Sequence, residues 1–202
     1  MEYSASVRIW GPIQSRERDR RYVAPLWHVL KAYNLGAIAG SSVQMSRELE
    51  VEFVEIDLIL VNPDKTVDLL KRTLEEAGAP VGSEIRITRN EGEEVIRFGR
   101  KEGLAVYLDG VGLPDSVYET CSADWLTGLI FGTLTAVGGE IRSSWVGPNE
   151  TAIYMYGPSA EEMYAALEPI LAEYPLCRNA RVVIRHGNPA LEPRSVRLPL
   201  GV

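Results

Sequence analysis

One supersecondary unit occurs twice in this chain, and this duplication limits the folds that the chain can adopt. Residues 139–184 can be laid over residues 36–87. Each copy starts at a glycine and contains two strand-like segments, a turn with proline, a helical segment and a last strand-like segment. Matching Asn62-Pro63 to Gly157-Pro158 pairs Leu58 with Ile153 and Leu60 with Met155. Both copies are therefore predicted to fold as strand, strand, helix, strand.

A further strand and helix precede each copy. Residues 4–10 alternate apolar and polar side chains, and Pro25 suits the first turn of the helix that follows. Residues 104–108 alternate in the same way, and Ser122 is a suitable cap for the next helix. The order β-α-β-β-α-β in each half is that of a ferredoxin-like unit. The predicted fold class is α+β, with tandem duplicated ferredoxin-like units and antiparallel sheets.

The duplication divides the chain into four segments. We predict a first unit at residues 1–88, a connection at residues 89–102, a second unit at residues 103–186 and an extended C-terminal arm at residues 187–202. The arm alternates apolar residues with others, which predicts an edge strand or a docking arm; the apolar residues are Val196, Leu198, Leu200 and Val202. A homodimer through this arm is one prediction for the assembly.

Composition narrows the choice of partners and location. The net charge of −7 argues against a protein that grips phosphate backbones, so no nucleic acid is predicted as a partner. No apolar run approaches the roughly 18 to 20 residues that cross a bilayer, so no membrane association is predicted either. Without a secretion signal, a cytoplasmic location with Cys121 and Cys177 as free thiols is expected.

Two pairs of closely spaced glycines have alternative interpretations. Gly110 and Gly112 could bring backbone N–H groups close to a ligand, but without a complete nucleotide-binding motif a plain turn is favoured. Gly128 and Gly132 lie four apart in a helical segment and could let another element approach closely. We predict that this element is the sheet of the same unit.

A ferredoxin-like unit covers one face of its sheet with helices and leaves the other face open. Tandem units of this plan resemble the α+β barrel group, in which two open faces come together around a central space. Other tandem ferredoxin-like proteins join their sheets edge to edge or pack their helices together. The resemblance covers residues 3–186, concerns the fold alone and implies no catalytic residue.

Strand periodicity places aromatic and charged side chains on the open faces. The candidate ligand-binding residues are Asp57, Tyr107, Tyr154, Tyr156 and Arg185. Rings would provide apolar area for a small molecule or a partner protein, and charges would orient it. The alternative interpretation is that the tyrosines only seal one unit against the other. Aromatic residues on these strands are also typical of RNA-recognition sheets, but the basic signature of those sheets is missing.

Catalytic motifs are absent from the sequence. It contains no His-x-x-x-His, Cys-x-x-Cys or Gly-x-Ser-x-Gly, and neither a metal nor a cofactor is predicted. Asp57, near Glu55, and His186 are the candidates for a general base, although cross-strand pairing with Arg8 or Arg86 is the favoured explanation of the carboxylates. We predict a non-enzymatic ligand-binding or regulatory module. The alternative is a cofactor-independent enzyme of the α+β barrel type.

Overall fold

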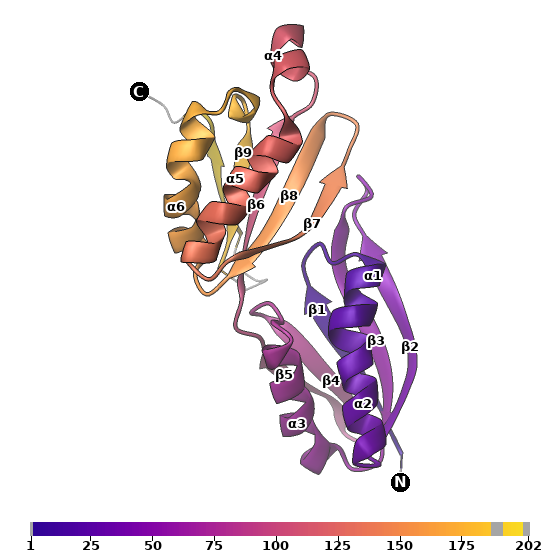
Figure 1. Ribbon diagram of the computed structural model, residues 1–202. Coiled ribbons are helices and arrows are strands. Elements are labelled where there is room, and N and C mark those ends of the chain that lie inside the picture. Colours follow the sequence, from indigo (N-terminus) through magenta and orange to yellow (C-terminus); the bar gives the residue numbers. More distant parts are fainter. Residues whose placement is uncertain (1, 187–191, 200–202) are drawn as a thin grey trace. The chain divides into compact units, whose positions relative to one another are not determined.

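The computed structural model describes residues 2–186 and 192–199 of the chain. The chain forms two compact units, Met1–Lys101 and Glu102–Val202 (Figure 1). Each unit contains one five-stranded sheet in which all neighbouring strands are antiparallel. No helix in the described ranges combines the length and apolar character that a membrane crossing requires.

The first unit has the strand order β2-β3-β1-β4-β5. Its strands are β1 (Tyr3–Trp10), β2 (Gly36–Met45), β3 (Val51–Leu60), β4 (Ser83–Arg89) and β5 (Gly92–Phe98). Its helices are α1 (Ser15–Arg18), a π-helical turn (Asp19–Val23), α2 (Ala24–Ala32) and α3 (Pro63–Glu76). The α1-to-α2 segment and α3 lie side by side on one face of this sheet (Figure 1).

The second unit repeats this topology with the strand order β10-β9-β6-β8-β7. Its strands are β6 (Glu102–Asp109), β7 (Glu140–Val146), β8 (Glu150–Gly157), β9 (Arg181–Arg185) and β10 (Arg194–Arg197). Its helices are α4 (Asp115–Thr120), α5 (Ala123–Ala136), α6 (Ala160–Glu173) and a 3-10 turn (Pro175–Cys177). Helices α5 and α6 cover one face of the sheet (Figure 1). The predicted fold class, tandem ferredoxin-like units with antiparallel sheets, is confirmed.

The register between the two copies differs from the predicted one by two residues. The side chains of Asn62 and Ser159 cap α3 and α6, so these two residues are equivalent. Strand pairing supports this equivalence. The position of Leu58 in the pairing of β3 with β1 corresponds to the position of Met155 in the pairing of β8 with β6. The predicted match of Leu58 with Ile153 was wrong. The predicted match aligned Pro63 with Pro158. Pro63 is the first residue of its helix, whereas Ser159 lies between Pro158 and α6.

A β-bulge marks the same place in both sheets. The pairing of β2 with β3 shifts between Ile38 and Gly40, and the pairing of β7 with β8 shifts between Ile141 and Ser143. Ile38 lies opposite Leu58, and Ile141 lies opposite its equivalent Met155. A bulge inserts one extra residue and increases the local twist. The two units therefore share a detail of backbone geometry as well as the order of their strands.

A fifth strand extends each sheet beyond the ferredoxin-like plan. Residues of the predicted connection form β5, which pairs with β4 and lies at the edge of the first sheet. Residues of the predicted arm form β10, which pairs with β9 in the same position of the second sheet. Leu198 follows β10 and is buried in the core of the second unit. Leu200 and Val202 lie outside the described residues.

Helix α5 turns one apolar side toward the sheet. Leu126, Ile130 and Leu134 are buried in the core of the second unit. Gly128 and Gly132 are exposed, and a Cβ built on either glycine would meet nothing within 4 Å. The prediction that these glycines bring α5 close to the sheet was wrong. Helical spacing alone could not tell the two sides of this helix apart, because both sides are apolar.

Candidate functional site

Three tyrosines lie together on the sheet face of the second unit that its helices do not cover. Tyr107 comes from β6, and Tyr154 and Tyr156 come from β8. Alternation along the strands explains the arrangement, because their neighbours Val106, Ile153 and Met155 point into the helix-covered core. We call this cluster the tyrosine face; it also contains Ala105, Ala152, Val183 and the partly buried Trp145.

Guanidinium groups lie over the rings of the tyrosine face. The Cζ atom of Arg181 is 3.9 Å from the centroid of the Tyr107 ring, and that of Arg142 is 4.6 Å from the Tyr156 centroid. The rings of Tyr107 and Tyr154 meet edge to face, with centroids 6.1 Å apart. Cations are attracted to ring faces, and edge-to-face rings attract each other, so these contacts fix the orientation of the rings.

Carboxylates hold the same arginines. Arg181 Nη2 donates to Glu150 Oε2 at 2.9 Å, and Arg142 Nη2 lies 2.8 Å from Glu140 Oε1. The side chain of Arg142 is fully buried. Each guanidinium therefore has both a carboxylate and an aromatic ring beside it.

Arg185 lies next to the tyrosine face, with Gly103 between it and Tyr156. Gly103 in β6 lies opposite Tyr156 on one side and opposite Arg185 on the other. A Cβ built on Gly103 would be 3.4 Å from the Tyr156 ring and 3.7 Å from the Cβ of Arg185. The ring and the arginine therefore lie beside each other above the glycine. Of the predicted ligand-binding residues, the fold brings Tyr107, Tyr154, Tyr156 and Arg185 together.

Sequence reasoning missed Arg181, Arg142 and Gly103. Arg181 could have been found, because it lies two residues before Val183 on the same side of β9. Arg142 could not, because it is the extra residue of the β7 bulge and strand alternation fails there. Gly103 precedes the strand predicted at residues 104–108, and its role depends on the register of three strands.

Asp57 belongs to the first unit, on the sheet face that its helices leave uncovered. It is exposed, and it lies opposite Ser6 and Gly40 on the neighbouring strands. Its neighbour Glu55 accepts hydrogen bonds from Ser6 Oγ at 2.9 Å and from Arg8 Nη2 at 3.3 Å. Glu55 thus forms the cross-strand ion pair that was considered as an alternative to acid-base chemistry.

His186 follows β9 and lies between two carboxylates. Its Nε2 is 3.4 Å from Glu161 Oε1, and its Nδ1 is 3.7 Å from Glu102 Oε2. Glu102 Oε2 also accepts a hydrogen bond from the Ala160 N–H at 2.7 Å, at the first turn of α6. Glu161 in turn pairs with Arg194 at 3.2 Å. The imidazole is about half exposed.

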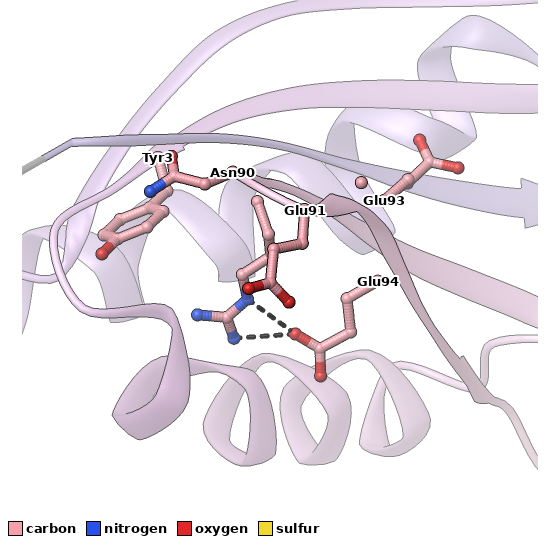
Figure 2. A pocket seen from close by; sticks show the side chains of 7 residues that line it. Tyr3, Asn90, Glu91, Glu93 and Glu94 are labelled. Atoms are coloured by element: carbon pink, nitrogen blue, oxygen red, sulfur yellow. Dashed lines mark hydrogen bonds and ion pairs between the residues drawn. The ribbon is translucent and has the colours of Figure 1, made fainter.

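An open pocket of about 460 Å³ lies at the hairpin between β4 and β5 (Figure 2). Its lining residues are Tyr3, Arg89, Asn90, Glu91, Gly92, Glu93 and Glu94. Arg89 Nε donates to Glu94 Oε2 at 2.8 Å, the contact drawn in Figure 2, and Arg89 Nη2 donates to Asp64 at 2.6 Å. The hydrogen bonds that Arg89 donates to Asp64 and Glu94 raise its pKa. Arg89, the cation of this lining, therefore already pairs with Asp64 and Glu94.

An aspartate of the turn after β6 accepts hydrogen bonds from the backbone of that turn. Asp109 Oδ1 accepts from the N–H groups of Val111 at 3.0 Å and Gly112 at 2.8 Å. These two hydrogen bonds lower the pKa of Asp109. The backbone N–H groups that could have bound a ligand donate instead to the aspartate of the same turn. This agrees with the prediction of a plain turn.

No known protein-family model and no curated protein matches the chain. Among solved structures, an unknown protein from Galdieria sulphuraria is 14% identical, with 92% of this chain and 98% of that chain covered and a TM-score of 0.28. The regulatory subunit of aspartate kinase from Thermus thermophilus is 12% identical over 83% of this chain and 91% of that chain, with a TM-score of 0.27. The first two RRM domains of a yeast poly(U)-binding protein are 11% identical over 90% and 98%, with a TM-score of 0.23.

These similarities carry no argument about function, because every identity is under 25% and every TM-score is below 0.5. The prediction that nucleic acid is not a partner therefore remains a prediction. In the described ranges, no group of three or more His, Cys, Asp or Glu residues is arranged to hold a metal ion.

Proposed function

We propose that this chain is a non-enzymatic binding module whose tyrosine face holds a small molecule with a flat apolar part and an anionic group. The observation that carries this proposal is the placement of guanidinium groups over tyrosine rings, with Arg181 at 3.9 Å from Tyr107 and Arg142 at 4.6 Å from Tyr156. Ligand sites combine aromatic area with a few placed charges, and this face has both.

The small residues of the face support a flat ligand. The central strand β6 contributes Gly103 and Ala105, and β8 contributes Ala152 beside Tyr107. Tyr154 and Tyr156 rise on one side of β6, and Val183 and Arg185 lie on the other. These small residues are buried, so a planar group would lie on them, with rings at its edges, only after it displaced the side chains that now cover them.

The arginines support an anionic ligand. Arg181 and Arg142 are each held by a carboxylate, so a ligand carboxylate would compete with Glu150 or Glu140 for them. The tyrosine rings are only 2% to 4% exposed, so a ligand must also displace groups that now pack on the rings. Because a ligand must compete with carboxylates and displace packed groups, we expect modest affinity for a simple probe. A ligand that contacts several arginines should bind more tightly.

Isothermal titration calorimetry with aromatic carboxylates, such as 2-naphthoate, tests the proposal, with acetate as the control ligand. The wild-type chain should bind naphthoate and not acetate, and replacing Tyr154 and Tyr156 with Ala should abolish binding while the fold is kept. Ile59→Ala is a matched control, because Ile59 occupies the position equivalent to Tyr156 in the first unit and is 39% exposed. If no aromatic carboxylate binds and the double variant unfolds, the tyrosines serve stability alone.

A cofactor-independent enzyme is the second candidate, with His186 or Asp57 as the general base. The contacts of His186 with Glu161 and Glu102 favour His186, since a carboxylate can orient an imidazole. Under this proposal His186→Gln would abolish turnover of a substrate and leave naphthoate binding unchanged. A partner protein in place of the small molecule, or a homodimer through the C-terminal arm, would instead appear as a change of mass in solution.

A further inference from the structure

One arginine of each fifth strand occupies an equivalent position in the two sheets. Arg97 in β5 lies opposite Glu84 of β4, and Arg197 in β10 lies opposite Arg181 of β9. The pairing through the central strands β1 and β6 makes these two positions equivalent. The second unit therefore has a second arginine where the first unit has an acid.

The acid of the first unit neutralises the arginines around it. Arg97 Nε lies 3.5 Å from Glu84 Oε1, and Arg86 Nη2 lies 2.7 Å from Glu84 Oε2. Glu84 also lies opposite Arg8 on its other neighbouring strand. Opposite charges thus alternate across this part of the first sheet, which is the favourable arrangement for cross-strand pairs.

The second unit lacks this compensation at its edge. Arg181 contacts the Tyr107 ring and pairs with Glu150. Among the residues that the structure describes, Arg197 has no hydrogen-bond or ion-pair partner, and it is exposed. Directly opposed residues have Cβ atoms about 4.5 to 5.5 Å apart, and like charges at this spacing repel. An anion between the two guanidinium groups would remove this repulsion.

Two ordinary explanations account for part of the arrangement. A charge on an edge strand discourages pairing with another chain, which would explain Arg97 and Arg197 alike. The contact with the Tyr107 ring would explain Arg181. Neither explains why the arginine opposite Arg181 has no acid beside it.

We propose that Arg197 and Arg181 bind a phosphate group, with the hydroxyl of Ser195 as a further donor. Opposed residues of paired strands lie on the same face of a sheet, so both guanidinium groups can reach one anion. Ser195 lies two residues before Arg197 on the same side of β10 and is exposed, and the Arg181 side chain is 28% exposed. Guanidinium groups bind phosphate oxygens through paired N–H donors. Two of them and a hydroxyl match the three terminal oxygens of a phosphate monoester better than the two oxygens of a carboxylate.

The net charge of −7 does not prevent an anion from binding at this edge. Helix α6 contributes four carboxylates to that charge, and it covers the opposite face of the sheet. Glu161, the α6 acid that contacts β10, pairs with Arg194 at 3.2 Å. Exposed charges farther apart than about 8 Å are largely screened at physiological ionic strength. The local balance of Arg197, Arg181 and Glu150 is positive.

The place of this pair next to the tyrosine face indicates the class of ligand, and this part of the inference rests on the proposed function. Tyr107 lies opposite Arg181 on the next strand. Neighbouring strands are about 4.8 Å apart, so a phosphate between Arg197 and Arg181 is within about 10 Å of the Tyr107 position. A phosphate attached to a flat aromatic system spans this distance. The ligand is therefore an aryl phosphate monoester.

Inorganic phosphate tests the arginine pair without the tyrosine face. About 20 mM phosphate should raise the melting temperature of the wild-type chain by roughly 2 to 4 °C over sodium chloride of equal ionic strength. Arg197→Gln should abolish this shift. Arg97→Gln should keep it and is the matched control, because it removes the same charge from the equivalent, 70% exposed side chain of the first unit. Each variant is compared with its own melting temperature in chloride, and circular dichroism checks that it is folded.

Calorimetry with 2-naphthyl phosphate and 2-naphthoate tests the class of ligand. The wild-type chain should bind the phosphate at least about tenfold more tightly than the carboxylate, because the phosphate has more charge and one more oxygen for the arginines. Arg197→Gln should bring the two affinities together, whereas Arg97→Gln should leave their ratio unchanged. A purely structural role of Arg197 would weaken both ligands equally and would overturn the inference.

The remaining outcomes separate this inference from the proposed function. The phosphate site is overturned if phosphate does not protect the wild-type chain, or if it protects Arg197→Gln as well. Loss of the shift in Arg97→Gln as complete as in Arg197→Gln also overturns it. If 2-naphthoate does not bind, but phosphate protects the wild-type chain and not Arg197→Gln, the proposal for the tyrosine face fails and the phosphate site stands.

Discussion

The guanidinium carbon of Arg181 lies 3.9 Å from the centroid of the Tyr107 ring, and the same side chain donates to Glu150 at 2.9 Å. Arg181 therefore connects β9 to β6 through the ring and to β8 through the carboxylate. Replacing it with alanine should remove both contacts. A cation over a ring contributes about 0.5 to 2 kcal/mol, so we expect Arg181→Ala to lower the free energy of unfolding by about 1 kcal/mol in urea titrations.

Arg181→Lys separates shape from charge in this contact. Lysine keeps the positive charge but lacks the planar fork that reaches a ring and a carboxylate together. We expect it to recover less than half of the lost stability and little of the naphthoate binding. Full recovery of both would mean that charge alone matters at this position.

The two cysteines should differ in reactivity. Both are free thiols, as predicted; Cys177 is buried and Cys121 is partly exposed. Burial raises the pKa of Cys177 to about 12. The thiolate is the reactive form, so at pH 8 a thiol reagent should modify Cys121 in the native protein and Cys177 only after unfolding. Mass spectrometry of the labelled protein checks this, and rapid native labelling of Cys177 would contradict it.

The same pKa predicts a loss of stability in alkali. An unfolded thiol ionises near pH 9 and the folded Cys177 thiol near 12, so the folded state holds its proton more tightly between these values. The contribution of the neutral thiol is therefore complete below about pH 9 and is lost as the pH rises toward 12. Cys177→Ala should unfold with a smaller pH dependence in this range, measured by urea titration.

The C-terminal segment should contribute to stability through Leu198. This side chain is buried in the core of the second unit, and its N–H donates to the Ala180 carbonyl at 2.9 Å. Truncating a buried leucine costs about 2 to 5 kcal/mol, and we expect Leu198→Ala to fall at the lower end because it lies at the edge of the core. Deleting residues 194–202 should cost at least as much. An unchanged melting temperature after the deletion would show that the segment contributes nothing.

Two glycine substitutions should have opposite effects. Gly128→Ala adds a methyl group into open space and should stabilise the fold by about 1 kcal/mol. Gly103→Ala adds one at 3.4 Å from the Tyr156 ring and 3.7 Å from the Cβ of Arg185, and it should disturb the tyrosine face. Urea titration and naphthoate calorimetry measure the two effects. Equal effects on stability would contradict the packing described for Gly103.

The fold was largely predictable because it is determined by periodicity and duplication. Alternating strands such as β1 and β6, and the caps Asn62 and Ser159, are local signals that tertiary packing did not overturn. The register was not predictable, because Pro63 and Pro158 occupy different places relative to their helices. The sequence also could not show which side of α5 faces the sheet, because both sides of this helix are apolar.

The candidate site was predictable only in part. Tyr107, Tyr154 and Tyr156 follow from strand alternation and lie together as expected. The position of Arg142 depends on a bulge, and the placement of Arg185 beside Tyr156 depends on Gly103 and on the pairing of three strands. Strand alternation also places Asp57 on an open sheet face, but this face belongs to the other unit. A sequence pattern does not show whether residues on equivalent faces of two units belong to one site.

Nuclear Overhauser effects between 2-naphthoate and the protein test whether the tyrosine face binds a flat anionic molecule. We expect effects from the naphthoate ring protons to the rings of Tyr107, Tyr154 and Tyr156, with shifts of the Arg181 and Arg185 side-chain resonances. Effects confined to other residues, or none at concentrations that saturate the calorimetric signal, would show that the tyrosine face is not the binding site.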